Sequence, residues 1–147
     1  VGSEMCIRDS RNTVVELDGK LADLVREWFD LPKAPRVKIR VGEARKVTET
    51  FAPSSRDVVI RDVFAGYVTP TSLTTLEFTQ IVSESLAPNG LYIINCGDAP
   101  DLAGARAEAA AIAEVFEYTC AAASPPNIRT TPGCEILPAA LRRGVTV

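Results

Sequence analysis

The sequence predicts an α/β fold that is doubly wound, with a mostly parallel sheet and helices on both faces. Short β-rich runs alternate along the chain with stretches of helical periodicity. Helices of roughly 10 to 17 residues between strands are typical of the crossovers that keep neighbouring strands parallel. Acids also follow three successive predicted strands. The carboxyl ends of strands are where open parallel sheets bind their ligands, so this edge is the place to look for a site.

The first third of the chain contains two predicted strands with one helix between them. Residues 13–17 are a β-rich run that ends at the turn pair Asp18-Gly19. Within residues 20–29, apolar side chains recur at spacings of three and four, which predicts a helix with one apolar stripe: Leu21, Leu24, Val25 and Trp28. Residues 37–41 alternate apolar and polar side chains, as in a strand with one covered face, and Gly42-Glu43 follows.

Two more strands and two helices are predicted from residue 57 onward. Residues 57–62 form the third strand, and a helix is expected from about Pro70 to the closing Pro88-Asn89-Gly90. Residues 91–94 form a strand, and residues 101–116 form an alanine-rich helix. Between these two elements, Cys96 is expected to be a small buried hydrophobe.

The length of 147 residues is enough for one ordinary domain with a core. We expect residues 1–10 to be a non-native tail, because VGSEMCIRDS resembles a translated sequencing adapter and lacks the apolar core of a secretory signal. Residues 11–123 form the predicted domain. Residues 124–147 contain several turn-forming prolines and no clear strand, and they stay unassigned.

The composition excludes several classes of function. The net charge of -3 argues against nucleic acid as a partner, and no apolar run is long enough to cross a membrane. The four cysteines show no metal or redox spacing, so we expect reduced thiols, a cytoplasmic location and no metal site. The absence of histidine removes the histidine-dependent nucleophile systems. Any chemistry must depend on carboxylates, backbone groups and a bound small molecule.

The acids at the strand ends are the candidate site residues: Glu16, Asp18, Glu43 and Asp62. An acid after a strand can accept both ribose hydroxyls of an adenine nucleoside, since a carboxylate has two acceptor oxygens. Glu43 would accept from the adenine amino group, and Asp62 would face the reacting end of the ligand. Each acid also has a purely structural reading: Asp18 as a helix N-cap, Glu43 as part of a strand-to-helix turn, and Asp62 as the cap of a loop.

Four motifs resemble, in order and spacing, the spermidine synthase family and its spermidine-synthase-like relatives: "VVELDG", "GEAR", "DVVIRDVF" followed by "TP..L.T.EF", and "LAPNGLYIIN". The resemblance covers about residues 13–118. It implies the class I fold of S-adenosylmethionine-dependent methyltransferases, which is Rossmann-like, and a role in polyamine biosynthesis. It also implies S-adenosylmethionine or decarboxylated S-adenosylmethionine as a substrate, with a small-molecule amine as acceptor and a homodimer as a possible assembly.

The resemblance assigns roles to the same acids. Glu16 resembles the ribose-binding acid of the family, and Asp18 is its companion. Glu43 stands where the family usually has an aspartate that contacts adenine. Asp62 resembles the acid that takes a proton from the attacking amine. In aminopropyl transfer the sulfonium of the cofactor supplies the leaving group, so the protein must hold the amine in line and let it lose its proton. A carboxylate can do both.

The chain also departs from the family pattern. Ala65 stands where aminopropyltransferases have a second aspartate, and the glycine-rich loop and first strand expected before residue 13 are missing. We interpret this as an N-terminally truncated fragment, which would leave a gap beside the strands at Val14 and Val58. Three readings therefore stay open: an aminopropyltransferase, a methyltransferase of unknown acceptor, or an inactive fragment or interaction module.

Overall fold

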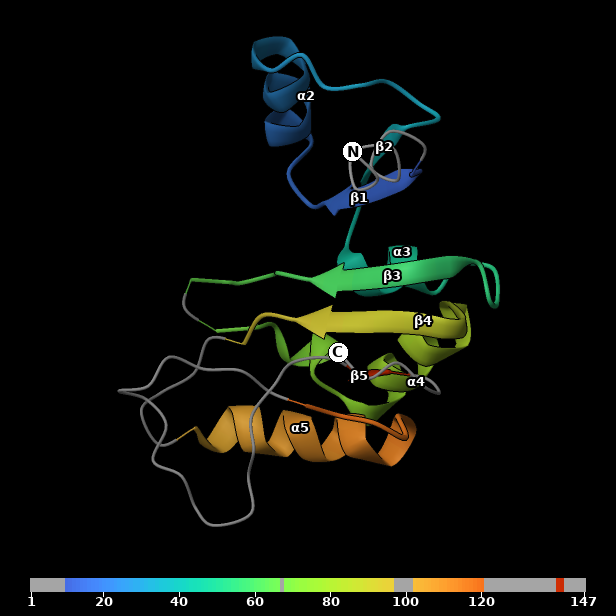
Figure 1. Ribbon diagram of the computed structural model, residues 1–147. Helices are drawn as coiled ribbons and strands as arrows, with labels where there is room; N and C mark the ends of the chain where they lie inside the picture. Colours follow the sequence, from blue (N-terminus) through green and yellow to red (C-terminus); the bar gives the residue numbers. More distant parts are fainter. Residues whose placement is uncertain (1–9, 67, 97–101, 121–139, 142–147) are drawn as a thin grey trace. The chain divides into compact units, whose positions relative to one another are not determined.

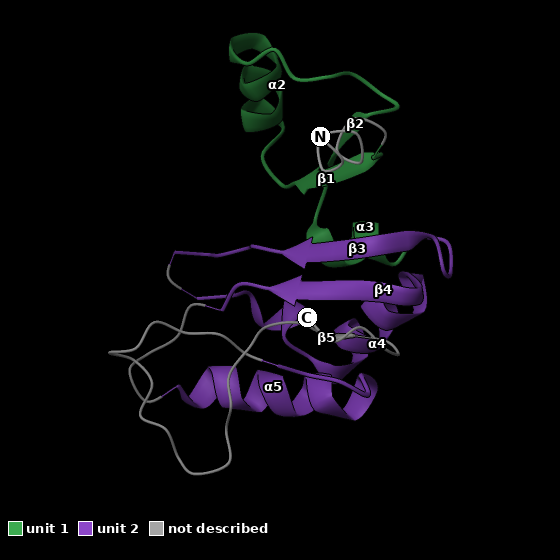
Figure 2. Ribbon diagram, viewed as in Figure 1, with its two compact units in different colours: residues 1–50 green, residues 51–147 purple. Residues whose placement is uncertain are grey.

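A computed structural model describes residues 10–66, 68–96, 102–120 and 140–141 (Figure 1). The chain divides into two compact units, Val1–Thr50 and Phe51–Val147 (Figure 2). The expected non-native tail, apart from its last residue, lies outside the described residues. The unassigned tail of residues 124–147 also lies outside them, except for two residues that form a short strand.

The first unit contains a parallel pair of strands, β1 (Asn12–Glu16) and β2 (Val37–Val41). Between them in the sequence lies helix α2 (Gly19–Trp28), and β2 is followed by the short helix α3 (Ala44–Thr48). The strands pair in register from Asn12 opposite Val37 to Glu16 opposite Val41. Parallel strands require a crossover, and α2 supplies it. The predicted order of elements is therefore confirmed in this unit.

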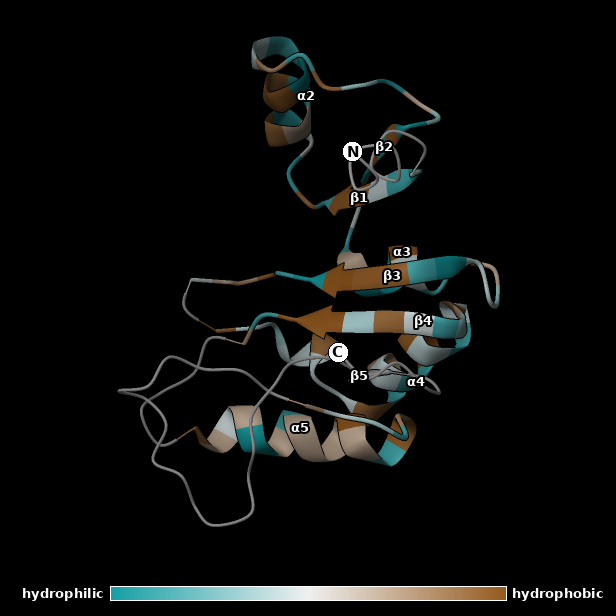
Figure 3. Ribbon diagram, viewed as in Figure 1, coloured by the Kyte–Doolittle hydropathy of each residue, from teal (hydrophilic) through white to brown (hydrophobic). Residues whose placement is uncertain are grey.

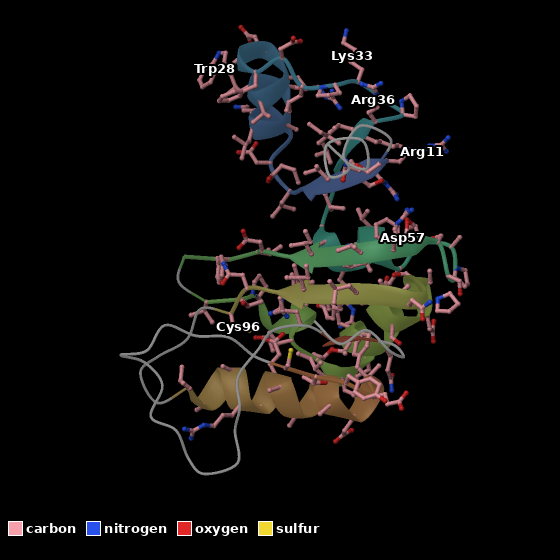
Figure 4. All side chains as sticks on the ribbon, viewed as in Figure 1. Arg11, Trp28, Lys33, Arg36, Asp57 and Cys96 are labelled. Atoms are coloured by element: carbon pink, nitrogen blue, oxygen red, sulfur yellow. The ribbon has the colours of Figure 1, made fainter. Side chains whose placement is uncertain are left out.

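The apolar stripe predicted on α2 is only partly covered. Ala22 is the buried residue of this helix, whereas 46% of Leu21 and 68% of Trp28 are exposed to solvent. Figure 4 shows Trp28 at the end of α2 with its side chain pointing away from the helix axis. The periodicity identified the helix correctly. Leu21 and Trp28 both belong to the predicted stripe, so the stripe is not wholly buried.

The second unit contains the strands β3 (Arg56–Arg61) and β4 (Leu86–Ile94), which pair in parallel. Between them lie the 3-10 turn η1 (Thr71–Leu73) and helix α4 (Leu76–Ser85), and β4 is followed by helix α5 (Ala103–Val115). The two-residue strand β5 (Ala140–Leu141) pairs antiparallel with β4 at Leu91 and Tyr92. Figure 1 shows α4 and α5 on one side of the β3–β4 pair.

The boundaries of α4 differ from the prediction at both ends. Residues after Pro70 form η1, and α4 begins only after Thr75, whose hydroxyl accepts a hydrogen bond from the backbone N–H of Phe78. At the other end, α4 stops at Ser85, and β4 already begins at Leu86. The Pro88-Asn89-Gly90 segment therefore lies inside β4, where the register with β3 shifts between Arg56 and Val58. Proline and glycine are tolerated in strands at such irregularities.

The core of the second unit lies between the strand pair and the two helices. Figure 3 shows the hydrophobic residues of β3 and β4 toward the arrowheads of these strands. Tyr92 of β4 stacks against Phe116 at the end of α5, with ring centroids 6.0 Å apart. The buried hydrophobic residues of this unit are Leu73, Phe78, Val82, Leu86, Tyr92, Ile112 and Phe116. Burial of this set holds η1, α4, α5 and β4 together.

The described strands form two separate ladders, β1–β2 and β3–β4–β5. The side chains of Val14 and Val58, beside which the gap was expected, are exposed over 45% and 48% of their surface. The neighbouring Ile60 on β3 is exposed over 66%. None of the described helices is long and apolar enough to cross a membrane.

Candidate functional site

Glu16 and Asp18 lie at the carboxyl end of β1 and are joined by a hydrogen bond. One carboxylate oxygen of Glu16 accepts the backbone N–H of Asp18 at 2.9 Å. Asp18 is the N-cap of α2, and its Oδ1 accepts the N–H groups of Lys20 at 2.8 Å and Leu21 at 3.3 Å. The N-cap reading of Asp18 is thus confirmed. A carboxylate here is also favoured by the positive end of the helix dipole.

Glu43 has the same local role at the end of β2. It is the N-cap of α3, and its two carboxylate oxygens accept the backbone N–H groups of Arg45 at 3.0 Å and Lys46 at 2.9 Å. These two backbone hydrogen bonds, the one from Lys46 first, hold the pKa of Glu43 below its ordinary value. Glu43 is therefore an anion at neutral pH, and its reading as part of a strand-to-helix turn is confirmed.

These three acids meet at one edge of the first unit. Because β1 and β2 are parallel, their carboxyl ends lie at the same edge of the sheet. The backbone N–H of Gly42 donates to the carbonyl of Glu16 at 2.9 Å, which places the residue before Glu43 beside Glu16. A Cβ on Gly42 would lie 2.9 Å from a methyl carbon of Val47, so a larger residue here would force the buried Val47 side chain to shift. The strand ends that carry Glu16, Asp18 and Glu43 thus lie side by side, and a shared ligand site for these acids stays a prediction.

Asp62 belongs to the second unit, so its place beside the other three acids stays a prediction. It directly follows β3, is exposed, and accepts a hydrogen bond at 3.0 Å from the side-chain amide of Asn95. The backbone N–H of Asn95 in turn donates to the carbonyl of Arg61 at 2.9 Å. A carboxylate at a strand end, oriented by a neighbouring amide and open to solvent, is able to bind an amine and accept its proton.

The sequence did not single out Asn95 as a site residue. The signal was present, because Asn95 directly follows the predicted strand of residues 91–94 and so obeys the rule that identified the acids. Only charged side chains were considered at the strand ends. An amide at the same place orients a carboxylate without changing the net charge.

A tight turn follows Asp62. The backbone N–H of Ala65 donates to the carbonyl of Val68 at 2.9 Å, and Gly66 between them has a positive φ of 70°. Glycine adopts that conformation without the steric cost that other residues have. Ala65, which stands where aminopropyltransferases carry a second aspartate, is therefore part of a turn.

A buried ionic cluster lies behind Asp62, and no sequence pattern indicated it. The guanidinium of Arg61, 4% exposed, forms an ion pair with Glu108 of α5, 7% exposed. The same guanidinium donates to the Leu73 carbonyl at 2.7 Å and approaches the Cys96 sulfur at 3.8 Å. The Cys96 thiol donates to Glu108 at 3.3 Å. These contacts join the end of β3 to η1, α5 and Cys96, the second residue after β4.

Within the cluster, Cys96 and Arg61 keep their protons at neutral pH. Partial burial of the thiol, together with the Glu108 carboxylate beside it, raises the pKa of Cys96 to about 11. Burial by itself would lower the pKa of Arg61, but the hydrogen bond with Glu108 raises it overall. Cys96 (labelled in Figure 4) is exposed as a whole residue, so the expectation of a buried hydrophobe is wrong. Its thiol acts as a hydrogen-bond donor, because polar groups surround the sulfur.

The chain is similar to known spermidine synthases. A "probable spermidine synthase" from Corynebacterium glutamicum is 59% identical and superposes with a TM-score of 0.79, and the match covers 83% of this chain and 44% of that one. A "Probable polyamine aminopropyl transferase" from Bifidobacterium longum is 32% identical over 106 residues, which cover 71% of this chain and 23% of that protein. The chain thus spans less than half the length of either relative. No family model matches it.

A protein with lower sequence identity has a similar fold. Human methyltransferase-like protein 13, solved in complex with SAH, superposes with a TM-score of 0.58 at 20% identity, and the match covers 86% of this chain and 61% of that one. At this identity the similarity shows the fold alone. The resemblance to spermidine synthases and the Rossmann-like methyltransferase fold, both expected from the sequence, are confirmed.

Proposed function

We propose that the protein carrying this chain transfers an aminopropyl group from a sulfonium nucleoside, decarboxylated S-adenosylmethionine, to a small amine. The observation that carries this proposal is the 59% identity to a probable spermidine synthase over 83% of the chain. The geometry supports it in two places: the three acids at the end of β1–β2, and the exposed Asp62 at the end of β3.

The three acids of the first unit would hold the nucleoside. Glu16 already accepts one hydrogen bond from the Asp18 N–H, and Glu43 accepts two from the start of α3. These bonds fix both carboxylates in place, and an ionised carboxylate offers about four acceptor positions, so capping does not exhaust them. Glu16 and Asp18 would accept the ribose hydroxyls, and Glu43 would accept from the adenine amino group. Fixed acceptors lose little rotamer freedom when the ligand binds.

Asp62 would act on the amine. A free alkylamine has a pKa of about 10 and is mostly protonated at neutral pH. Asp62 would bind this cation as its counter-ion and take one proton. The nitrogen lone pair then forms a bond to the carbon attached to the sulfonium, the C–S bond breaks, and its electron pair stays on sulfur. Methylthioadenosine leaves as a neutral thioether. The Asn95 amide would keep the Asp62 carboxylate oriented toward the amine.

The test supplies the full-length protein with decarboxylated S-adenosylmethionine and putrescine and measures methylthioadenosine. In Asp62→Asn we expect turnover to fall by about a hundredfold or more, as loss of a general base does. The dissociation constant of methylthioadenosine should stay within about twofold, because the three nucleoside-binding acids are unchanged. Asp57→Asn is the matched control, since Asp57 is an exposed acid at the opposite end of the same strand (Figure 4).

Each result decides between specific alternatives. A parallel assay supplies S-adenosylmethionine. Formation of the demethylated cofactor there, with no methylthioadenosine in either assay, would identify a methyltransferase instead. Equal loss of turnover and nucleoside binding in Asp62→Asn contradicts the assignment of Asp62 as the base. Equal turnover of several amines by the wild-type protein would leave the chemistry intact but reject putrescine as the specific acceptor.

A further inference from the structure

Arg61 closes the loop that begins at Asp62. The loop leaves β3 at Asp62, turns at the Ala65–Val68 pair and passes through η1. The carbonyl of Leu73, twelve positions after Arg61, then accepts the Arg61 guanidinium at 2.7 Å. The Arg61 side chain therefore joins the start of the loop, beside Asp62, to its end at Leu73. Closing a loop at a fixed point removes much of its conformational freedom.

The far side of the same guanidinium is fixed by α5. Glu108 pairs with it inside the fold, and Cys96 contacts both partners. Arginine suits this position because its planar group has five donors and can bind several acceptors at once, whereas lysine is a single point charge. Glu108 and Cys96 also line a pocket of about 260 Å³ whose opposite wall is the loop itself, with Thr69, Thr71 and Thr74. The cluster thus supports both walls of this pocket.

The part of the loop next to Asp62 has little burial to hold it. Phe64 is 39% exposed and Val68 is 65% exposed, whereas Leu73 at the other end is 2% exposed. Loop segments with few buried contacts are the ones that open locally. The Arg61 contact at Leu73 is therefore well placed to limit the motion of the whole segment.

We propose that Arg61 is a positioning residue for the amine site: by tying the Leu73 carbonyl to Glu108 of α5, it holds the loop after Asp62 in one conformation. This inference rests on the proposed function, because it explains why the loop beside Asp62, the acid that would bind the amine, is held rigid. Arg61 itself, being buried, acts through the loop and does not touch the substrate. The nucleoside-binding acids belong to the other unit and should be unaffected.

The test uses the full-length protein and removes the contacts of Arg61 with Leu73 and Glu108 without leaving an unpaired buried charge. Replacing both partners of a buried ion pair by apolar residues is often tolerated, whereas removing one partner is strongly destabilising. The double variant Arg61→Met/Glu108→Leu is therefore compared with the wild type, and Arg61→Lys tests whether charge alone is enough. Arg106→Met is the matched control, because Arg106 is an exposed arginine on the same helix as Glu108.

We expect kcat for aminopropyl transfer to fall by about tenfold to a hundredfold in the double variant, the size of effect that small misplacement of a reacting group produces. The affinity for methylthioadenosine should stay within about twofold of the wild type. A general loss of folding would instead lower both kcat and this affinity. Hydrogen exchange should become faster at the Leu73 and Thr74 amides, which bond within the loop. Arg61→Lys should lie between the wild type and the double variant, and Arg106→Met should match the wild type.

The outcomes separate the two proposals. A wild-type protein that forms no methylthioadenosine contradicts the proposed function, and the role of Arg61 at the amine site is then rejected with it. If the wild type is active and the double variant has the same kcat and the same hydrogen exchange in the loop, only the positioning role of Arg61 is overturned. A double variant that loses nucleoside affinity as strongly as turnover also overturns it, since Arg61 would then stabilise the fold in general.

Discussion

The acids at the strand ends combine two roles that sequence reasoning treats as alternatives. Asp18 and Glu43 each cap a helix, as the structural reading proposed, and each stays at the edge where a ligand would bind. The two roles are compatible because capping uses backbone N–H groups on one side of the carboxylate and leaves acceptor positions on the other. A capping carboxylate is also fixed in place before any ligand arrives, which favours binding of hydroxyl or amino donors.

The charge of Glu43 should contribute to stability in a pH-dependent way. Its pKa is lowered in the folded protein by the N–H groups of Lys46 and Arg45, from an ordinary value of 4.5. A depressed pKa means that the contribution is complete above the unfolded value and is lost as pH falls through the folded one. We expect Glu43→Gln to lower the free energy of unfolding by about 0.3 to 1 kcal/mol at pH 7, and by less at about pH 3. Urea unfolding at both values measures this.

The control for this prediction is Glu27→Gln, at an exposed position near the end of α2. It should change the free energy of unfolding by no more than about 0.5 kcal/mol, the usual range for surface substitutions. A Glu43→Gln deficit that is the same at both pH values would show that the lost side-chain geometry, and not the charge, is responsible.

Residues that act through long-range contacts were beyond the reach of the sequence. The strand-end acids were found because their position follows from local periodicity and a general rule for parallel sheets. Arg61 and Glu108 are 47 positions apart, and nothing local to either one indicates a partner. Glu108 lies in an alanine-rich helix, where a charged residue is normally assigned to the solvent-exposed face. Such pairs become visible only once the packing of α5 is known.

At the level of elements, the type of each main segment was predictable and its boundaries were not. The helix expected from Pro70 begins after Thr75, because the preceding residues bond as a 3-10 turn and the Thr75 hydroxyl accepts the N–H of Phe78 in the first turn of α4. The strand expected from residue 91 begins at Leu86, because a register shift with β3 accommodates Pro88-Asn89-Gly90. Turn-forming residues mark an irregularity, but they do not say whether the element stops there.

The N-cap of α4 can be tested directly. Thr75→Ala removes the hydroxyl that accepts the Phe78 N–H at 3.2 Å. We expect the free energy of unfolding to fall by about 1 kcal/mol, the usual cost of replacing a threonine cap by alanine. Thr71→Ala is the control, since Thr71 is exposed at the start of η1. If both variants lose the same stability in urea unfolding, the helix does not depend on this cap.

At the scale of the molecule, the candidate chemistry is divided between two units. The acids proposed to bind the nucleoside lie in the first, at the end of β1–β2, and the acid proposed to bind the amine lies in the second, at the end of β3. This division was not predicted, because the sequence was interpreted as one domain over residues 11–123 with its acids at a single sheet edge. The sequence could not indicate how the units are stabilised, since the buried hydrophobic residues described in the second come from η1, α4, β4 and the α5 region together.

This division predicts that nucleoside binding and amine chemistry respond to different substitutions. A ligand that binds only the folded state stabilises it by about 2.7 kcal/mol at one hundred times its dissociation constant. We therefore expect methylthioadenosine to raise the melting temperature of the full-length protein, and Glu16→Gln to remove most of that rise, because the amide replaces one carboxylate acceptor by a donor. Asp62→Asn should keep the rise. A rise of equal size in all three proteins would show that the β1–β2 edge does not hold the nucleoside, whatever the fate of the amine site.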